Sequence, residues 1–111
     1  MSLKHLSKAI SIFFILSVCS LGANAATIYG GGASCGKIVS EADDYETGAV
    51  HMTYTMGWVS GINMIADVNW KNPPDPQGIW QALLAYCAKN PLSSHRDAIM
   101  ATYKQISDSQ K

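Results

Sequence analysis

Apolar residues recur at helical spacing in three stretches of the chain, and no segment alternates with the period of two that strands require. The longest stretch covers residues 49–68. A second covers residues 76–89, and a third follows Ser94. A shorter helix is predicted from residue 34 to about residue 44. The pattern predicts an all-α domain of four helices, and the three stripes consist of Val50, Tyr54, Trp58, Ile62 and Ile65, of Ile79, Trp80, Leu83, Leu84 and Cys87, and of Ile99, Tyr103 and Ile106.

Capping residues mark where these helices should begin. Asp75 followed by Pro76 is a well-formed start, because the carboxylate can accept hydrogen bonds from first-turn amides and proline suits the first helical position. Ser94 is followed three residues later by an aspartate, which resembles a capping box. For the 49–68 helix, either Asp44 or Thr47 can serve as the cap.

The first 25 residues have the three parts of a secretory signal peptide. Lys4 and Lys8 precede an apolar run from Ala9 to Leu21, and Ala23-Asn24-Ala25 supplies the small residues that a signal peptidase requires. The run has 13 residues, whereas a membrane-spanning helix needs about 18 or more. We therefore expect cleavage after Ala25 and export to the periplasm.

A lipid anchor on Cys19 is the competing interpretation of this leader. It requires a small residue directly before the cysteine, but Val18 occupies that position. We therefore expect a soluble mature chain without a stable membrane span. Its residues 26–33 include consecutive glycines and should form a flexible arm, and its residues 34–111 should form the helical domain.

The mature chain would keep two cysteines, Cys35 and Cys87. An even number of cysteines in an oxidising compartment is typical of a disulfide, and two cysteines allow one pairing. Closing a loop of this length should stabilise the fold by about 4 kcal/mol, a large share of the stability of a small domain. A catalytic thiol would need an unpaired cysteine, so thiol catalysis is not expected.

Gly57 and Gly61 lie four residues apart in the longest apolar stretch. Because each glycine weakens a helix by about 1 kcal/mol relative to alanine, the pair predicts that another helix approaches closely there, from the same chain or from a second copy. Trp58 lies on the apolar stripe between them and is predicted to be structural. The 49–68 helix as a whole is expected to be buried in the core.

Trp70 lies outside every apolar stripe, in the loop that ends at Pro74. Aromatic residues in such positions are enriched at binding surfaces, so Trp70 is a candidate partner-binding residue. The alternative is that the indole folds back and covers the core. The sequence leaves both open.

No motif for catalysis, metal binding or a cofactor is recognisable, and the protein is not expected to be an enzyme. The acidic residues around Asp44 precede a helix, where negative charge is favoured, so no metal site is predicted with His51. His95 is expected to be solvated. The mature chain has six basic and eight acidic side chains without a basic stripe, which argues against nucleic acid as a partner.

The spacing of Cys35, the Gly57-Trp58-Val59-Ser60-Gly61 segment, the Asp75-Pro76-Gln77-Gly78-Ile79 helix start and Tyr86-Cys87 resembles the small periplasmic proteins of the HdeA/HdeB type. Those are four-helix, single-disulfide acid-stress chaperones that are often dimeric. The layout also resembles periplasmic immunity proteins that neutralise effectors of type VI secretion. The resemblance covers roughly residues 34–106. This chain departs from the chaperone group in its sparse charge.

The resemblance implies a protein that works by binding another protein, either unfolded clients or a cognate toxin. Acid could drive the first activity. Below about pH 3 nearly all carboxylates are neutral, so the mature side chains would carry a charge of about +8 with both histidines protonated. Self-repulsion could then split a homodimer and expose its apolar seam.

Overall fold

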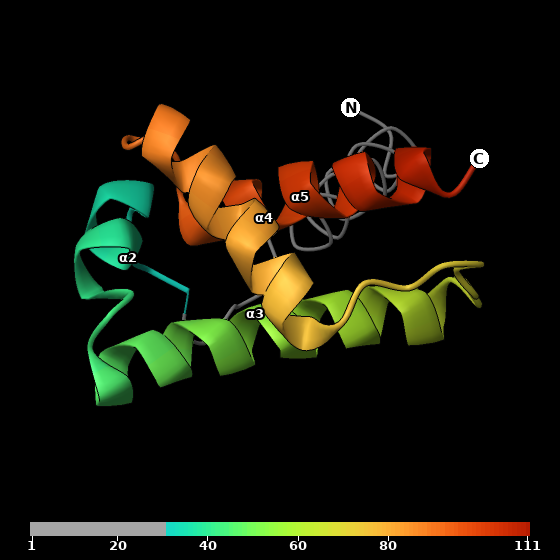
Figure 1. The fold of residues 1–111 in the computed structure, drawn as a ribbon, viewed down its shortest axis with the longest axis horizontal. Coiled ribbons are helices and arrows are strands. Elements are labelled where there is room, and N and C mark those ends of the chain that lie inside the picture. Colours follow the sequence, from blue (N-terminus) through green and yellow to red (C-terminus); the bar gives the residue numbers. More distant parts are fainter. Residues whose placement is uncertain (1–30) are drawn as a thin grey trace, which may run out of the picture.

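Four helices make up residues 31–111, which are the residues that the computed structural model describes (Figure 1). They are α2 (Cys35–Glu41), α3 (Tyr45–Ile65), α4 (Pro76–Lys89) and α5 (His95–Ser109). Within this part of the chain no β-strand occurs, so the predicted all-α, four-helix fold is confirmed. The predicted signal peptide, Cys19 and the first part of the glycine-rich arm lie outside the described residues.

Side-chain caps set the helix starts. Asp75 accepts a hydrogen bond from the backbone amide of Gly78 at 2.6 Å, and Pro76 begins α4 as predicted. Ser94 accepts from the amide of Asp97 at 3.1 Å and begins α5. These starts were predictable because cap and first turn are adjacent in sequence, so no distant contact is needed to define them.

The boundary between α2 and α3 differs from the prediction. The first helix ends at Glu41, and α3 begins at Tyr45 because Asp44 caps it by accepting from the amides of Glu46 and Thr47. Gly48 lies against this turn, where an added Cβ atom would stand 2.6 Å from the carbonyl oxygen of Ala42. Glycine therefore allows the two helices to meet at a short connection.

The core forms where α2, α4 and the start of α5 meet α3 (Figure 1). Its fully buried apolar residues surround the disulfide between Cys35 and Cys87, which is present as predicted. In Figure 1 α3 and α5 run along the length of the domain, and α4 crosses between them. The buried hydrophobic residues are Cys35, Ile38, Val59, Ile79, Trp80, Leu83, Cys87, Ala98, Ile99 and Ile106.

The prediction that the 49–68 helix is buried in the core is wrong for much of α3. The face of α3 that packs inward contains Gly48, Thr55 and Val59. By contrast, Val50 and Ile65 from the predicted inner stripe are 66% and 90% exposed. The buried face is rotated by about one residue, or about 100°, from the predicted one. Because apolar residues lie on every side of α3, spacing alone did not identify the inner face.

Candidate functional site

A shallow apolar groove runs along the outer face of α3. It has a volume of about 400 Å³, and every residue that lines it belongs to this helix. Two glycines, two aromatic residues and two isoleucines form it. We call this surface the α3 groove, and its residues are Tyr54, Gly57, Trp58, Gly61, Ile62 and Ile65.

The two glycines leave the groove open. Among the described residues, no heavy atom of another element lies within 4 Å of a Cβ atom built at Gly57 or Gly61. The prediction that another helix approaches them is therefore wrong for a helix of residues 31–111. Approach by a second molecule remains a prediction. A glycine pair on an exposed helix weakens that helix without any compensating contact in the single chain.

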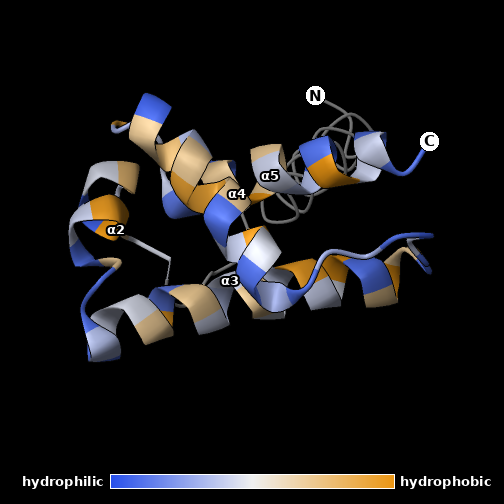
Figure 2. Ribbon diagram, viewed as in Figure 1, coloured by the Kyte–Doolittle hydropathy of each residue, from blue (hydrophilic) through white to orange (hydrophobic). Residues whose placement is uncertain are grey.

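Aromatic rings form one wall of the groove. The rings of Tyr54 and Trp58 lie 6.3 Å apart at an angle of 58°, and both pack against the core on their inner sides. Trp58 packs against the core, but it is half-buried and also lines the groove. At the C-terminal end of α3, where Figure 2 shows hydrophobic positions, Ile65 is 90% exposed and Met64 is 77% exposed.

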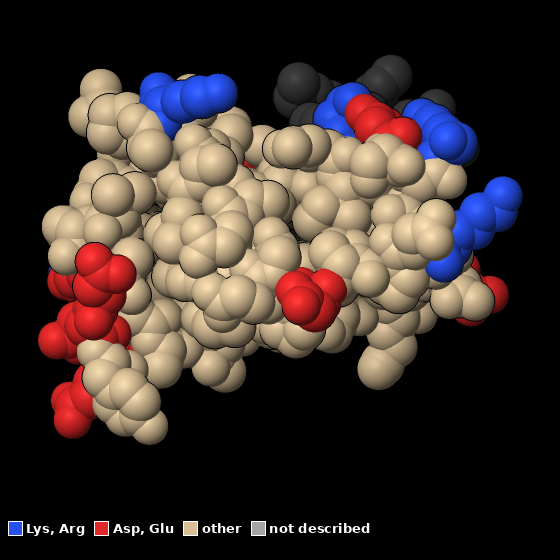
Figure 3. Space-filling view, viewed as in Figure 1, with Lys and Arg blue, Asp and Glu red and all other residues tan. Residues whose placement is uncertain are grey.

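Charged residues are absent from the groove and gather at the two ends of the domain. From Met52 to Ile65, α3 contains no acidic or basic side chain. The turn between α2 and α3 is acidic. The opposite end, near the loop after α3 and the end of α5, carries lysines and aspartates together, and Asp108 pairs there with Lys104 and Lys111 (Figure 3). Between these ends most of the visible surface in Figure 3 carries no charge. The acidic residues at the turn are Glu41, Asp43, Asp44 and Glu46, and the lysines are Lys71, Lys104 and Lys111.

Trp70 folds back onto α5. Its indole nitrogen donates a hydrogen bond to the hydroxyl of Ser107 at 3.3 Å, and its ring lies 5.3 Å from the ring of Tyr103. The side chain is half-buried against the core. Of the two alternatives for Trp70, this geometry matches the one in which it covers the core, so Trp70 is not a freely exposed anchor.

His95 is buried, and the expectation that it is solvated is wrong. The residue has no exposed surface, and its Nε2 atom lies 2.8 Å from the hydroxyl oxygen of Thr55. The backbone amide of His95 donates to the carbonyl of Ala33 at 3.0 Å. The cover thus comes from segments that lie 40 or more residues away along the chain, which no local sequence signal at His95 indicates.

Burial, together with a smaller effect of the nearby His51, lowers the pKa of His95 from 6.5 to about 4. The rings of the two histidines are 5.7 Å apart in an edge-on arrangement. His51 pairs with the carboxylate of Glu41 at 2.8 Å. A buried neutral imidazole of this kind is a chemically distinct feature of the fold, since charging it inside the protein is costly.

The acidic turn before α3 contains Asp44, the residue that caps this helix. Thr47 holds the pKa of Asp44 below its usual value, because its amide and hydroxyl both donate to the carboxylate. In residues 31–111, no three His, Cys, Asp or Glu side chains come together in a way that could bind a metal ion. Asp44 is therefore a helix cap.

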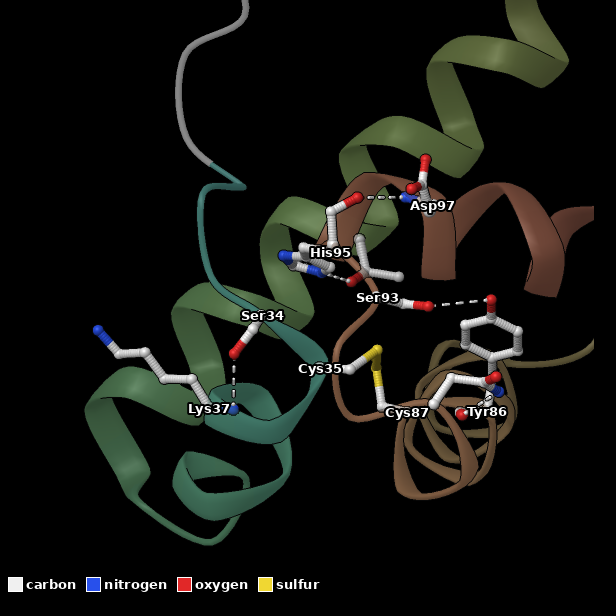
Figure 4. Close-up of a disulfide and its surroundings, with 11 residues drawn as sticks. Ser34, Cys35, Lys37, Tyr86, Cys87, Ser93, His95 and Asp97 are labelled. Atoms are coloured by element: carbon white, nitrogen blue, oxygen red, sulfur yellow. Dashed lines mark hydrogen bonds between the residues drawn. A yellow bond between two sulfur atoms is a disulfide. The ribbon is translucent and has the colours of Figure 1, made fainter.

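The disulfide joins α2 to α4. Figure 4 shows Cys35 at the start of α2 bonded to Cys87 near the end of α4, with His95 close by. Both cysteines are fully buried. The bond is thus structural in its setting, since neither sulfur is accessible to a substrate.

Within the described residues no helix combines the length and the hydrophobicity needed to cross a membrane. Comparison of the chain with known protein families, with curated proteins and with solved structures finds no match.

Proposed function

We propose that this is an exported, non-enzymatic protein that binds other proteins through the α3 groove, as a periplasmic chaperone of the acid-stress type. The observation that supports the proposal is the exposure of a continuous apolar face on the longest helix. Monomeric proteins rarely leave such faces uncovered, and those that do use them for association.

The charge distribution supports a second copy as the occupant of the groove at neutral pH. Two copies that packed antiparallel along α3 would place the acidic turn of each chain beside Lys71 and the Lys104–Asp108–Lys111 cluster of the other. A parallel pair would instead bring the two acidic turns together. The glycines would let the two helices approach closely, and no charge would be buried between Met52 and Ile65.

Acid would reverse this association. Below about pH 3 the carboxylates of the acidic turn are protonated, so the attraction between unlike ends is lost and every remaining charge is positive. Repulsion between two cationic copies then favours separation. The freed groove offers tyrosine, tryptophan and isoleucine side chains to apolar segments of unfolded clients.

The second candidate function is that of an immunity protein. It is favoured by the rigidity of the groove, which is built on a single helix whose aromatic wall is braced against the core. A preformed surface of this kind suits one cognate toxin, bound at neutral pH with little change of shape. In that case the aromatic residues Tyr54 and Trp58 would be the binding hot spots.

The test is an acid titration of the mature protein with a groove variant and a matched control. Ile65→Lys places a charge in the groove, at a side chain that is 90% exposed. The control, Leu92→Lys, places a charge outside the groove, at a side chain that is 96% exposed. Light scattering, binding of an apolar dye and suppression of client aggregation are followed from about pH 7 to about pH 2, across the carboxylate range.

For the chaperone, we expect a dimer at neutral pH, and dye binding and client protection that appear in acid. Ile65→Lys should be monomeric at pH 7 and should protect clients poorly, whereas Leu92→Lys should behave as the parent. A parent protein that stays dye-silent and protects no client would exclude the chaperone function. Capture of one partner at pH 7 by the parent, lost in Ile65→Lys, would then establish the immunity function.

A further inference from the structure

The hydrogen bonds of Thr55 determine which nitrogen of His95 carries the proton. The Thr55 hydroxyl has a single hydrogen, and it donates this hydrogen to the carbonyl of His51 at 2.8 Å. The same oxygen lies 2.8 Å from Nε2 of His95, so Nε2 must be the donor in that contact. The Nδ1 atom is then the basic nitrogen, and it is buried without a hydrogen-bond partner in the described structure.

His95 stands at a junction of three parts of the fold. Residues 33–36 run beside the loop before α5, where the amide of Cys35 donates to Ser93 at 2.8 Å and that of Gly36 donates to Pro91 at 2.9 Å. The amide of His95 donates back to Ala33. Its side chain reaches across to α3 at Thr55. Residue His95 of α5 therefore contacts the start of the domain through its backbone amide and α3 through its imidazole (Figure 4).

None of the ionisable groups around this junction is hydrogen-bonded to Nδ1 in the described structure. On α3 they are His51 and Tyr54, whose rings lie 5.7 and 5.0 Å from that of His95. The groups on the other elements are Lys37 and Glu41 of α2, Tyr86 of α4, and Arg96 and Asp97 of α5. Glu41 is engaged by His51, and Tyr86 contacts Ser93.

We propose that His95 is an acid trigger: a proton taken up from solvent at Nδ1 opens the junction between residues 33–36, α3 and the start of α5. The protonated ring would place an unpaired N–H donor and a positive charge at a buried position. Opening exposes the ring to water, which relieves both. This inference is independent of what the α3 groove binds, although Tyr54 contacts His95 and also lines the groove.

The direction of the pH effect follows from the lowered pKa of His95. In the unfolded or opened chain the imidazole takes a proton near pH 6.5, whereas in the closed fold it does so only near about 4. Stability is therefore lost as the pH falls from 6.5 to about 4, and the loss is complete below that. A difference of this size corresponds to a change of about 300-fold in the folding equilibrium constant.

NMR of the wild-type protein tests the trigger directly. We expect His95 to be the neutral Nε2–H tautomer at pH 6 and to titrate near about 4. The same titration should reduce the hydrogen-exchange protection factors of the Cys35, Gly36 and His95 amides. A ring that is charged at pH 6, or that titrates without any change at these amides, would overturn the proposal.

A pair of variants separates His95 from the general effect of acid. His95→Gln stays neutral at every pH and retains a side-chain N–H for Thr55, whereas His51→Gln removes the neighbouring imidazole. Between pH 7 and pH 4, denaturant unfolding should show that His95→Gln loses about 100-fold less in folding equilibrium constant than the parent. His51→Gln should retain most of the parent's loss. Equal losses in the parent and His95→Gln would refute the trigger, and if His95→Gln does not fold, the NMR titration of the parent decides.

Discussion

Tyr103 donates a hydrogen bond from its hydroxyl to the Oδ1 atom of Asn63 at 2.7 Å. The contact between His95 and Thr55 also joins residues 40 positions apart. The two contacts lie eight residues apart on both helices, so α3 and α5 run parallel and are fastened at two points. Side-chain hydrogen bonds, in addition to the apolar core, therefore fix the register of α3 against α5.

Removing these two contacts should have unequal effects. Thr55→Val leaves a fully buried Nε2–H without an acceptor, which should lower the free energy of unfolding by about 1–3 kcal/mol. Tyr103→Phe should lower it by only about 1 kcal/mol, because half-buried Asn63 can bond to water instead. Urea denaturation at pH 7 measures both. If Thr55→Val unfolds at the midpoint of the parent, the hydroxyl is not the acceptor of the imidazole proton.

The glycines of α3 should respond in opposite directions to an added methyl group. Gly57→Ala and Gly61→Ala place it in open space, so each should stabilise a monomeric chain by about 0.4–1 kcal/mol. Gly48→Ala is the contrast, because its Cβ would meet the Ala42 carbonyl and the variant should be destabilised. Thermal unfolding with the apparent mass recorded distinguishes the outcomes. If Gly61→Leu is less stable than the parent and its apparent mass is unchanged, the added side chain meets a contact within the chain.

Trp70→Ala should destabilise the domain. The half-buried indole covers Tyr103 and bonds to Ser107, so its loss should lower the free energy of unfolding by about 2 kcal/mol, roughly half the cost for a fully buried tryptophan. Trp70→Phe keeps the ring and should lower it by less. Denaturant unfolding compares the two. Should Trp70→Ala fold with parental stability and lose binding to a partner, the indole is a binding residue after all.

The disulfide should contribute a large part of the stability. Cys87→Ala is expected to lower the free energy of unfolding by about 2–5 kcal/mol, since the bond closes a separation of 52 residues. Guanidinium denaturation of the variant and of the reduced parent measures this loss. The two should agree closely. A variant as stable as the oxidised parent would contradict the structural role of the bond.

Export predicts a particular mass for the mature chain. The periplasmic protein should begin at Ala26 and should be about two mass units lighter than its reduced form, as one disulfide requires. Intact mass spectrometry before and after reduction checks both statements. A chain that begins at an acylated Cys19 would show that the protein is a lipoprotein.

Features encoded by neighbouring residues were predictable from the sequence. Asp75 with Pro76 gave the start of α4, Ser94 gave that of α5, and the cysteine count gave the disulfide. Each depends on a short segment or on simple pairing. The four-helix fold followed from these starts and from the apolar spacing between them.

The candidate site was predictable only in part, because tertiary contacts decide which of its residues are exposed and which are buried. Gly57 and Gly61 were recognised as unusual, but the face they occupy turned outward, since α3 offers apolar residues on all sides. His95 was missed because its cover includes Ala33, which is distant in sequence. Trp70 could not be assigned because a loop residue has no periodic face to indicate where it packs.

The bonds that hold residues 33–36 have a consequence for the order in which the chain is made. Cys35 emerges first during synthesis, yet its sulfur partner is 52 residues later, and the backbone acceptors at Pro91 and Ser93 follow that. The N-terminal residues of the domain therefore form their native contacts only after α4 and the loop that follows it have been made. A nascent chain that stops before α4 holds an unpaired thiol and lacks the core partners of α2, so it stays unfolded and exposed to proteases until nearly the whole domain has been delivered.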